Sequence, residues 1–273
     1  MSIYIIILHY KNIKDTIECL NSIQNLAKNR LNIKVILVDN DSTVTLTNSL
    51  YKSFVFEIIH NEKNLGYAGG MNIGIRKALK DKSAKYILIL NNDTVLPSNL
   101  LTKLLDNSSD IIGPVIAFRW NSKLVYDFGG SVNWWTGRTH HMESSSKLSK
   151  EFYNIKIDYV SGCCMLVRRE VFRKIGLFDE RYFFYFEDVD FCVRAKKAGF
   201  SISVNPDVYI YHKLGGSIGR WTNKAITNNI IGNFIFINKH LGWRRVTGYG
   251  YLFALTAKIV FDRVRGYISK EAH

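Results

Sequence analysis

The stretch Tyr86-Ile87-Leu88-Ile89-Leu90-Asn91-Asn92-Asp93 decides how the rest of this 273-residue chain is read. An uninterrupted apolar run predicts a strand that is buried on both faces, and this run stops abruptly at polar side chains. Pro97 blocks the continuation of the strand because proline has no backbone N–H. The carboxylate of Asp93 is therefore expected at the carboxyl edge of a sheet, where open α/β sheets bind ligands. A simple turn is the alternative, since Asn and Asp also favour turns.

Buried apolar runs alternate with segments of helical spacing through the first 117 residues. Strands are expected at residues 3–8, 33–38, 54–59, 86–90 and 111–116, and helices at 15–26, 70–79 and 98–105. This alternation implies βαβ units with right-handed crossovers. The sequence therefore predicts an α/β fold with a mostly parallel, Rossmann-like central sheet flanked by helices.

The composition is that of a globular protein with a strong positive charge. Hydrophobic residues make up 47% of the chain, which is enough for a large core, and the net charge is +14. Such a charge favours an anionic partner, namely nucleic acid, an anionic membrane surface or a phosphorylated substrate. The four cysteines lack CxxC spacing, and the first strand begins too early to leave room for a signal peptide, so we expect a cytoplasmic protein.

A glycine-rich segment, Asn64-Leu65-Gly66-Tyr67-Ala68-Gly69-Gly70-Met71-Asn72, follows the third predicted strand. Glycines before a helix let backbone N–H groups approach a ligand closely, and a helix N-terminus favours phosphate. A tight structural turn is the alternative. The dinucleotide-binding fingerprint is missing, because the turn after the first strand reads His9-Tyr10-Lys11-Asn12 instead of G-x-G-x-x-G.

The alternation stops between residues 118 and 157, where we expect an irregular excursion over the sheet edge. Trp134-Trp135 could stack against a sugar or pack in the core. His140-His141 are expected to be surface residues, because adjacent side chains rarely point the same way. The excursion also contains Gly129-Gly130.

An aromatic run, residues 183–186, leads into Glu187 and Asp188 where helical spacing begins again. Carboxylates in the first turn of a helix are favoured by its dipole, which makes helix capping one interpretation. Aromatic neighbours would instead desolvate a carboxylate and raise its pKa, which suits a general base. The residues alone leave both interpretations open. Asp190 is expected to pair with Arg194 one turn later.

Five motifs in this order resemble family 2 glycosyltransferases of the GT-A fold, and look most like bacterial rhamnosyltransferase-type enzymes that extend cell-surface glycans. They are Val38-Asp39-Asn40, residues 64–70, Asn91-Asn92-Asp93, Ser161-Gly162-Cys163-Cys164-Met165 and Phe186-Glu187-Asp188-Val189-Asp190. The resemblance implies a GT-A domain at residues 1–220 and a C-terminal helical, basic amphipathic extension at 221–273. Within the domain, residues 1–117 would bind the nucleotide sugar and 118–220 the acceptor.

The resemblance also implies a role for each matching residue. On the donor side, the base would contact Tyr10 and Asp39, and the ribose and diphosphate region would be lined by Asn64, Gly69, Gly70 and Asn72. Asn91-Asn92-Asp93 takes the position of the family's DxD motif, with Asn92 beside the donor and Asp93 as the metal ligand. His212 falls where some relatives have a second metal ligand, although a core or surface histidine is the alternative. Asp188 matches the catalytic base, and Glu187 is its acceptor-side neighbour.

The metal motif departs from the family pattern, because two of its three positions are asparagines. Mg²⁺ keeps several waters and takes one or two carboxylates plus substrate phosphates, so Asp93 alone can suffice. An imidazole ligand from His212 would shift the preference toward Mn²⁺. We therefore expect a divalent cation, Mn²⁺ or Mg²⁺, that is bound weakly without the donor.

The implied function is inverting transfer of a sugar from a nucleoside-diphosphate donor to a saccharide acceptor, in bacterial cell-surface polysaccharide synthesis. L-Rhamnose from dTDP-rhamnose is the first choice of donor, and UDP-linked N-acetylglucosamine, galactose or galactofuranose are alternatives. A polyprenyl-diphosphate-linked saccharide would suit the basic C-terminal end. A non-catalytic nucleic-acid-binding protein is the competing class; the chain has no recognised nucleic-acid motif, and carboxylates would lie at its ligand edge, so no nucleic-acid partner is expected.

The C-terminal residues from Trp243 onward combine apolar, aromatic and basic side chains. The uncharged stretch 246–257 falls well short of the roughly 20 apolar residues that a spanning helix needs. One hypothesis is a helix lying in the interface of an anionic membrane, on the inner face of the cell membrane. The other is a helix packed on the domain or on the second subunit of a homodimer.

Overall fold

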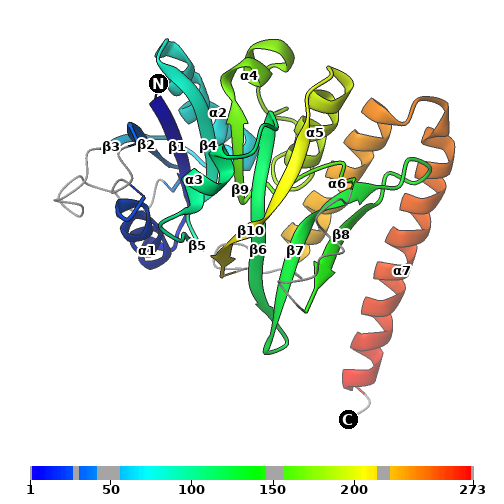
Figure 1. Cartoon of the computed structure of the whole chain (residues 1–273). Helices are drawn as coiled ribbons and strands as arrows, with labels where there is room; N and C mark the ends of the chain where they lie inside the picture. Colours follow the sequence, from blue (N-terminus) through cyan, green and yellow to red (C-terminus); the bar gives the residue numbers. More distant parts are fainter. Residues whose placement is uncertain (1, 27–30, 42–55, 146–155, 214–221, 272–273) are drawn as a thin grey trace.

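The computed structural model describes residues 2–26, 31–41, 56–145, 156–213 and 222–271. In these ranges a ten-stranded sheet carries helices on both faces (Figure 1). The strands are β1 (Ser2–His9), β2 (Ile33–Asp39), β3 (Phe56–His60), β4 (Ala84–Asn91), β5 (Thr94–Val95), β6 (Ile111–Trp120), β7 (Lys123–Val132), β8 (Thr139–Ser144), β9 (Cys164–Arg168) and β10 (Ile202–His212). The helices are α1 (Ile13–Gln24), α2 (Gly66–Lys80), α3 (Leu100–Leu105), α4 (Arg169–Ile175), α5 (Glu187–Lys197), α6 (Asn223–His240) and α7 (Arg245–Glu271). The predicted α/β class is confirmed.

The central sheet is mixed, whereas the sequence predicted a mostly parallel one. Its order is β3-β2-β1-β4-β9-β6-β10-β5, and the β7–β8 hairpin extends from β6. Strands β3, β2, β1 and β4 pair in parallel, as in a Rossmann-like half-sheet. Strand β9 then runs antiparallel between β4 and β6. The sequence did not predict this strand, and its direction is set by partners distant in the sequence.

Strand β1 is apolar throughout because both of its faces are covered. Ile5 and Ile7 contribute to a core with residues of α1 and α3. Ile6 and Leu8 point to the other face and pack in a core with residues of α2, α4, α5 and α6. Alternate side chains of a strand point to opposite faces, so an uninterrupted apolar run is what a three-layer arrangement requires.

Residues 118–144 form regular hairpins, so the irregular excursion predicted there is wrong for this part. Strands β6 and β7 are antiparallel and close at the pair Trp120–Lys123. Asn121 and Ser122 between them have φ of 47° and 63°, as a two-residue hairpin turn requires. This turn has no glycine, so the sequence carried only a weak signal for a hairpin here. Residues 146–155 of the same predicted excursion lie outside the described residues.

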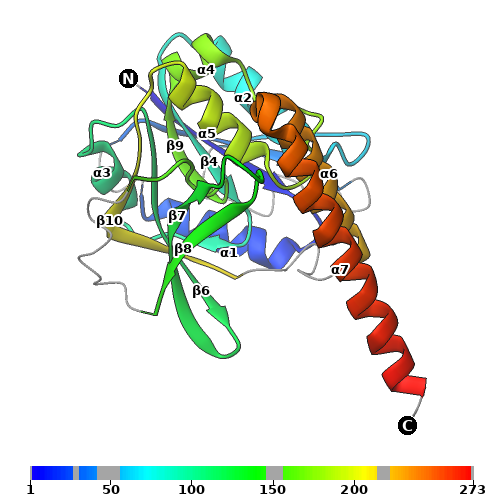
Figure 2. The same ribbon diagram turned by 90° about the vertical axis from the view of Figure 1, so that its right-hand side faces the viewer.

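The predicted C-terminal helices are present as α6 and α7, joined by a short turn. α7 packs on α6 through Gly248 and Leu252, and a Cβ at Gly248 would lie only 3.0 Å from Ile237 Cγ2. Beyond this contact α7 extends away from the sheet (Figure 2). Among the described residues, no helix combines the length and the apolar character needed to cross a bilayer. The proposed domain boundary at 220/221 falls partly outside the described residues, and the division into domains stays a prediction.

The two tryptophans of the β7–β8 turn have different surroundings. Trp134 packs against Phe236 of α6, with ring centroids 6.3 Å apart. Trp135 is 51% exposed and meets Trp243 edge to face at 5.4 Å. Neither tryptophan lines the cavity at the carboxyl edge of the sheet, so neither can stack against a sugar bound there. Trp134 instead packs against the core, as the alternative interpretation expected.

Gly74→Ala should destabilise the protein. A Cβ at this position of α2 would lie 2.4 Å from Ile6 Cγ2 and 3.1 Å from Val38 Cγ2. Both neighbours are fully buried in central strands, and overpacking of this kind costs about 1–3 kcal/mol. Gly250→Ala in α7 is the control, because its Cβ would meet nothing within 4 Å and alanine favours a helix by about 0.5–1 kcal/mol. Urea unfolding should show a lower midpoint only for Gly74→Ala; equal midpoints would contradict the packing.

Candidate active site

A cavity of about 610 Å³ opens at the carboxyl ends of the parallel strands. Tyr10 follows β1, Asn40 follows β2 and Asn91 ends β4, and all three line it. The other walls come from the β6–β7–β8 hairpins and the first turn of α5. This is the edge at which open α/β sheets bind ligands, as the sequence predicted for the end of β4.

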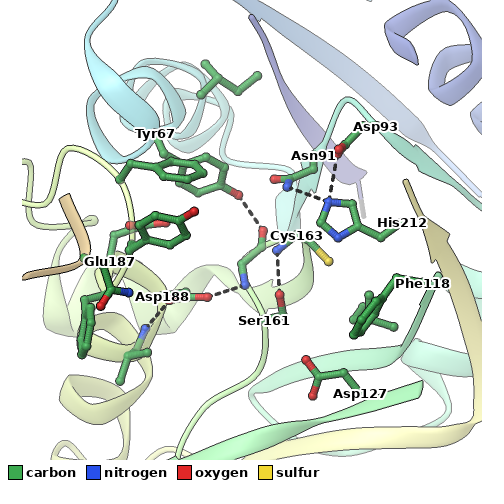
Figure 3. A pocket seen from close by; sticks show the side chains of 18 of the residues that line it. Tyr67, Asn91, Asp93, Phe118, Asp127, Ser161, Cys163, Glu187, Asp188 and His212 are labelled. Atoms are coloured by element: carbon green, nitrogen blue, oxygen red, sulfur yellow. Dashed lines mark hydrogen bonds and ion pairs between the residues drawn. The ribbon is translucent and has the colours of Figure 1, made fainter. Parts of the chain in front are cut away.

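Asp93 and His212 meet on one side of this cavity (Figure 3). His212 Nε2 lies 3.0 Å from Asp93 Oδ1. The short antiparallel pairing of β5 with β10 sets His212 opposite Thr94. The N–H of Lys213 donates to the carbonyl of Asp93 at 3.0 Å. Two segments distant in the sequence are thus held together at the predicted metal position.

Lys213 also fixes the end of β10 from the other side. Its Nζ lies 2.6 Å from both Asp15 Oδ1 and Glu18 Oε2 of α1. These ion pairs raise the pKa of Lys213, chiefly through the hydrogen bond to Asp15 and then that to Glu18. His212 is therefore attached to α1 as well as to β5.

The side chains around His212 offer donor atoms suited to a divalent cation. Asn91 Nδ2 lies 3.4 Å from His212 Nε2, and the buried Oδ1 of Asn91 has no hydrogen-bond partner among the described residues. Carboxylate oxygen, imidazole nitrogen and amide oxygen are ligand types that Mn²⁺ or Mg²⁺ accepts. No cluster of three or more His, Cys, Asp and Glu occurs in the described ranges, so other ligands would have to come from water and phosphate. The residues fit a metal, and ligation by Asp93 and His212 stays a prediction.

Asn92 and Asn64 also line the cavity, but each already has protein partners. Asn92 Nδ2 donates to Thr16 Oγ1 at 2.8 Å, which ties the turn after β4 to α1. Asn64 Oδ1 accepts from Asn40 Nδ2 at 2.9 Å and from the N–H of Gly66 at 2.8 Å. Their roles toward a donor therefore stay predictions, and what the geometry establishes is that they shape the cavity wall.

Asp39 is buried at the end of β2, and both of its carboxylate oxygens have partners. Oδ2 lies 3.0 Å from His60 Nδ1, and Oδ1 accepts from the N–H of Asp41 at 3.1 Å. Its side chain is not among those lining the cavity, and residues 42–55 beside it lie outside the described ranges. Its contact with a base stays a prediction. Sequence reasoning missed His60, whose only signal was its place directly after the predicted strand at 54–59; it is the last residue of β3.

Gly69, Gly70 and Asn72 do not line the cavity, contrary to the prediction. α2 begins at Gly66 and not at residue 70, so both glycines lie inside the helix. A Cβ at Gly70 would lie 2.4 Å from Leu8 Cδ1, so this glycine permits close packing on β1. Asn72 is 1% exposed, and its amide bonds the backbone of Phe178. These residues support the fold.

The first N–H groups of α2 are occupied by protein acceptors. Leu65 N–H donates to Asn40 Oδ1 and Tyr67 N–H to the carbonyl of Phe183 at 2.7 Å. Gly66 has φ +74°, and a Cβ there would come within 2.4 Å of the Phe183 oxygen. The close backbone approach expected from the glycines is therefore real, and at Gly66 it is made to the aromatic segment before α5.

Asp188 lies across the cavity from Asp93 (Figure 3). Its Oδ2 accepts from the N–H of Gly162 at 2.8 Å and its Oδ1 from the N–H of Val189 at 2.8 Å. Burial raises the pKa of Asp188, and these two hydrogen bonds and the charge of His141 oppose the shift. The bond to Gly162 leaves the helix altogether, which distinguishes Asp188 from a simple helix cap.

Glu187 is buried beside Asp188, and its Oε2 has no hydrogen-bond partner in the described structure. Burial, with the charge of Asp188, raises the pKa of Glu187 well above its ordinary value. Burial favours the neutral form of Glu187, whereas the two backbone hydrogen bonds that Asp188 accepts favour its ionised form.

The turn into α5 is held in an unusual backbone conformation. Tyr185 and Phe186 have φ of 75° and 72°, in the left-handed region that residues other than glycine rarely adopt. At the other end of the first turn, Asp190 is fully buried and pairs with Arg194 Nε at 2.7 Å, as predicted. It also meets His240 Nε2 at 2.7 Å, so α5 is anchored to α6. Strain of this kind persists where surrounding contacts enforce it.

Asp127 was missed by sequence reasoning, and His141 is exposed, as the sequence predicted, but it also reaches the cavity. Both side chains line the cavity, and His141 Nδ1 lies 2.8 Å from Asp127 Oδ2. His140 is exposed as expected. Adjacent residues of a strand point to opposite faces, so only one histidine of the pair can reach the site. Once β8 is recognised as a strand, this alternation is the signal that could have found it.

Residues 4–176 match the model of the family described as Glycosyl transferase family 2. The chain belongs to this family. The match covers β1 through α4, and α5 with Asp188 follows directly after it.

Three curated proteins have sequences similar to that of this chain. The low-salt glycan biosynthesis hexosyltransferase Agl10 of Haloferax volcanii is 26% identical over 72% of this chain and 62% of its own length. The dTDP-rhamnosyl transferase RfbF of Shigella flexneri is 28% identical over 67% and 61%. The N-acetylglucosaminyl-diphospho-decaprenol L-rhamnosyltransferase of Mycobacterium tuberculosis is 27% identical over 78% and 77%. The chain therefore matches only about three fifths of the length of the first two relatives.

Solved structures show the same fold at low sequence identity. GalNAc-T7, solved with UDP, GalNAc and Mn²⁺, superposes with a TM-score of 0.60 at 14% identity, over 87% of this chain and 50% of its own. S. aureus TarS gives a TM-score of 0.56 at 16% identity, over 92% and 71%. The predicted GT-A type of α/β fold is thereby confirmed.

Glu187→Gln should stabilise the protein increasingly as the pH rises. The folded-state pKa of Glu187 is above its unfolded value, so the folded wild type holds a proton that the unfolded chain has released. Wild-type stability is therefore lost as the pH rises from about 4.5 through the folded pKa, and glutamine removes this loss. Urea unfolding between about pH 5 and 8 should show a growing difference between variant and wild type. The exposed Glu143→Gln is the control, and parallel curves for all three proteins would contradict the prediction.

Proposed function

We propose that this protein is a glycosyltransferase that moves a sugar from a nucleoside-diphosphate donor to a hydroxyl group of a saccharide acceptor. The observation that carries the proposal is that one cavity has Asp93 and His212 on one side and Asp188 on the other. Glycosyl transfer needs counter-charge for the leaving diphosphate and a base for the attacking hydroxyl. Membership of family 2 supports the same reaction class.

The donor would bind with its base near Tyr10 and its diphosphate toward Asp93. Mn²⁺ or Mg²⁺ held by Asp93, His212 and substrate phosphates would supply positive charge against the diphosphate. Asn91, with its unpartnered Oδ1, would complete this side of the site. Tyr67 and the aromatic segment before α5 form the wall beside Glu187 and limit the access of water there.

Asp188 would take the proton of the acceptor hydroxyl. Gly162 N–H holds its Oδ2 in place and favours its ionised form, and burial favours the neutral form of Glu187. Because Asp188 lies across the cavity from Asp93, the hydroxyl would attack the face opposite the leaving diphosphate. A single displacement of this kind inverts the anomeric configuration, by the same reasoning as for inverting glycosidases.

We infer dTDP-L-rhamnose as the first donor to test. Two of the relatives are named as rhamnosyl transferases, one of them as a dTDP-rhamnosyl transferase. A UDP-sugar carrying N-acetylglucosamine, galactose or galactofuranose is the alternative. It is supported by the fold shared with GalNAc-T7 and TarS, which were solved with UDP and with UDP-GlcNAc. The process would be bacterial cell-surface polysaccharide synthesis.

Asp188→Asn and Asp93→Ala should fail in different ways. Asp188→Asn removes the base but leaves the diphosphate side intact, so turnover should fall about 10²–10⁴-fold while nucleoside-diphosphate binding with Mn²⁺ is retained. Asp93→Ala should lose both. Calorimetric titration with dTDP and UDP, and release of nucleoside diphosphate from a donor panel, measure the two properties separately. Full turnover by Asp188→Asn would remove this residue from its role.

The acceptor would be carried on a lipid diphosphate, and α7 would lie on the inner face of the cell membrane. Phe253 and Phe261 of α7 are 78% and 63% exposed, and Val260 is 56% exposed. Lys258 and Arg265 flank this apolar face on the same helix. Apolar side chains bordered by basic ones suit the interface of an anionic bilayer. The name of the mycobacterial relative includes a decaprenol-linked diphosphate, which supports such an acceptor.

Replacing Phe253 and Phe261 together by Ser should weaken binding to anionic vesicles at least about tenfold. Burying one such side chain contributes about 1.5–3 kcal/mol, and a tenfold change corresponds to about 1.4 kcal/mol. Leu124→Ser, at an exposed apolar position on the β7 hairpin, is the control. Co-sedimentation with phosphatidylglycerol vesicles measures binding, and undiminished binding would exclude the membrane role. If the double variant instead abolishes self-association in sedimentation, a second subunit covers this face.

A further inference from the structure

Asp127 and His141 both line the cavity, but the proposed reaction assigns no role to either of them. Asp127 on β7 is buried, and His141 on β8 keeps 45% of its side chain exposed. Asp127 Oδ2 lies 2.8 Å from His141 Nδ1, and Asp127 Oδ1 accepts from the N–H of Gly129 at 2.9 Å. Figure 3 shows Asp127 facing the same opening as Asp188. A fixed buried carboxylate therefore orients an imidazole that remains accessible from the cavity.

The sequence builds this pair through Gly129-Gly130. The pairing of β7 with β8 shifts register between Asp127 and Gly130, which is a β-bulge, and Gly129 has φ +89°. A Cβ at Gly130 would lie 2.2 Å from the ring of Tyr159. That ring packs edge to face on His141, with centroids 5.6 Å apart. The two glycines thus redirect Asp127 and let Tyr159 support the imidazole.

His141, when protonated, is a cation whose charge acts on Asp188, and Arg119 of β6 also lines the cavity. The groups that act on Asp188 or His141 come from four places: α5, the hairpin strands, α2, and the segment before and at the start of β9. They are Glu187, Asp188 and Cys192; Asp127 and Glu143; Tyr67; Tyr159 and Cys163. All of these are acids or neutral hydroxyl and thiol groups. A positive charge near these groups would therefore add to the two backbone hydrogen bonds in favouring the ionised form of Asp188.

We propose that His141, oriented by Asp127, is a positioning residue whose positive charge keeps Asp188 ionised and ready to accept the proton of the acceptor hydroxyl. The inference deepens the proposed glycosyl transfer and rests on it. The geometry links the two groups across the cavity, since the hairpin and the first turn of α5 both line it. No covalent step is involved, and His141 acts only through its charge.

The directions of the pKa shifts agree with this role. Partial burial acts to lower the pKa of His141, but the hydrogen bond and charge of Asp127, with the charge of Asp188, outweigh it, so the pKa is raised. In turn the charge of His141 works against the effect of burial on the pKa of Asp188. The charged forms of His141 and Asp188 therefore favour each other.

The first test needs no activity. The imidazole C–H resonances of His141, assigned by comparison with His141→Gln, are titrated by NMR in the wild type, Asp188→Asn and Asp127→Asn. Loss of either carboxylate should lower the pKa of His141, by about half a unit or more for Asp188→Asn. An unchanged titration in Asp188→Asn overturns the inference whether or not the protein transfers sugar.

The second test uses the pH dependence of kcat/KM with the active donor. In His141→Gln, which keeps a hydrogen-bond donor for Asp127, the acidic limb of the curve of kcat/KM against pH should shift to higher pH by about half to one unit. Below the limb kcat/KM should then fall about three- to tenfold, with the plateau unchanged. Asp127→Asn should move the limb in the same direction, whereas His140→Gln, on the opposite face of β8, should not. A limb that stays in place in His141→Gln, or moves equally in His140→Gln, overturns the inference.

The two tests separate failure of the inference from failure of the proposed function. If no donor in the panel yields transfer but the His141 titration responds to Asp188→Asn, the charge coupling stands and the reaction assignment fails. If transfer occurs and the titration does not respond, the reaction stands and the role of His141 is overturned.

Discussion

The backbone of Ser161-Gly162-Cys163 is the constraint on which the cavity depends. Gly162 donates its N–H to Asp188 and accepts the hydroxyl of Tyr67 at 2.6 Å on its carbonyl. The carbonyl of Cys163 accepts from the N–H of Asn91 at 2.9 Å. One short segment therefore joins α5, α2 and the end of β4. A Cβ at Gly162 would lie 3.1 Å from Asp188 Cβ, so a larger residue would push the carboxylate away.

This segment reaches the sheet edge because β9 runs antiparallel between β4 and β6. The reversed strand delivers its amino end to the carboxyl edge of the parallel strands, so its preceding residues face the cavity. Asp190, buried among Arg194, Lys239 and His240, then ties α5 to α6 from behind. A buried carboxylate with this many partners is costly to disturb, which holds the first turn of α5 in place. Helix α6 therefore supports the site from behind, and it also contributes Asn229 to the cavity lining.

Most of the fold could be predicted from the sequence because its signals are local. Apolar runs with a period of two or none predict strands, and the early strands and helices occur close to their expected positions. The direction of β9 and the hairpins at 118–144 could not be predicted in this way. Strand direction depends on distant partners, and the Asn121-Ser122 turn has no glycine to mark it. The contact of Gly66 with Phe183 could not be predicted for a similar reason, since the two residues are far apart in the sequence.

By itself the sequence determined the α/β class, the family resemblance and the residue types at the ends of β4 and in the first turn of α5. Those motifs are short and continuous, so the residue types that define them are adjacent in the sequence. Only the tertiary structure decided that His212 meets Asp93, that Gly162 holds Asp188, and that Asp127 and His141 share the cavity. The physical reason is that burial, hydrogen-bond partners and charge neighbours are set by segments far apart in the chain. The side chains that tune a site are therefore visible only after folding has brought those segments together.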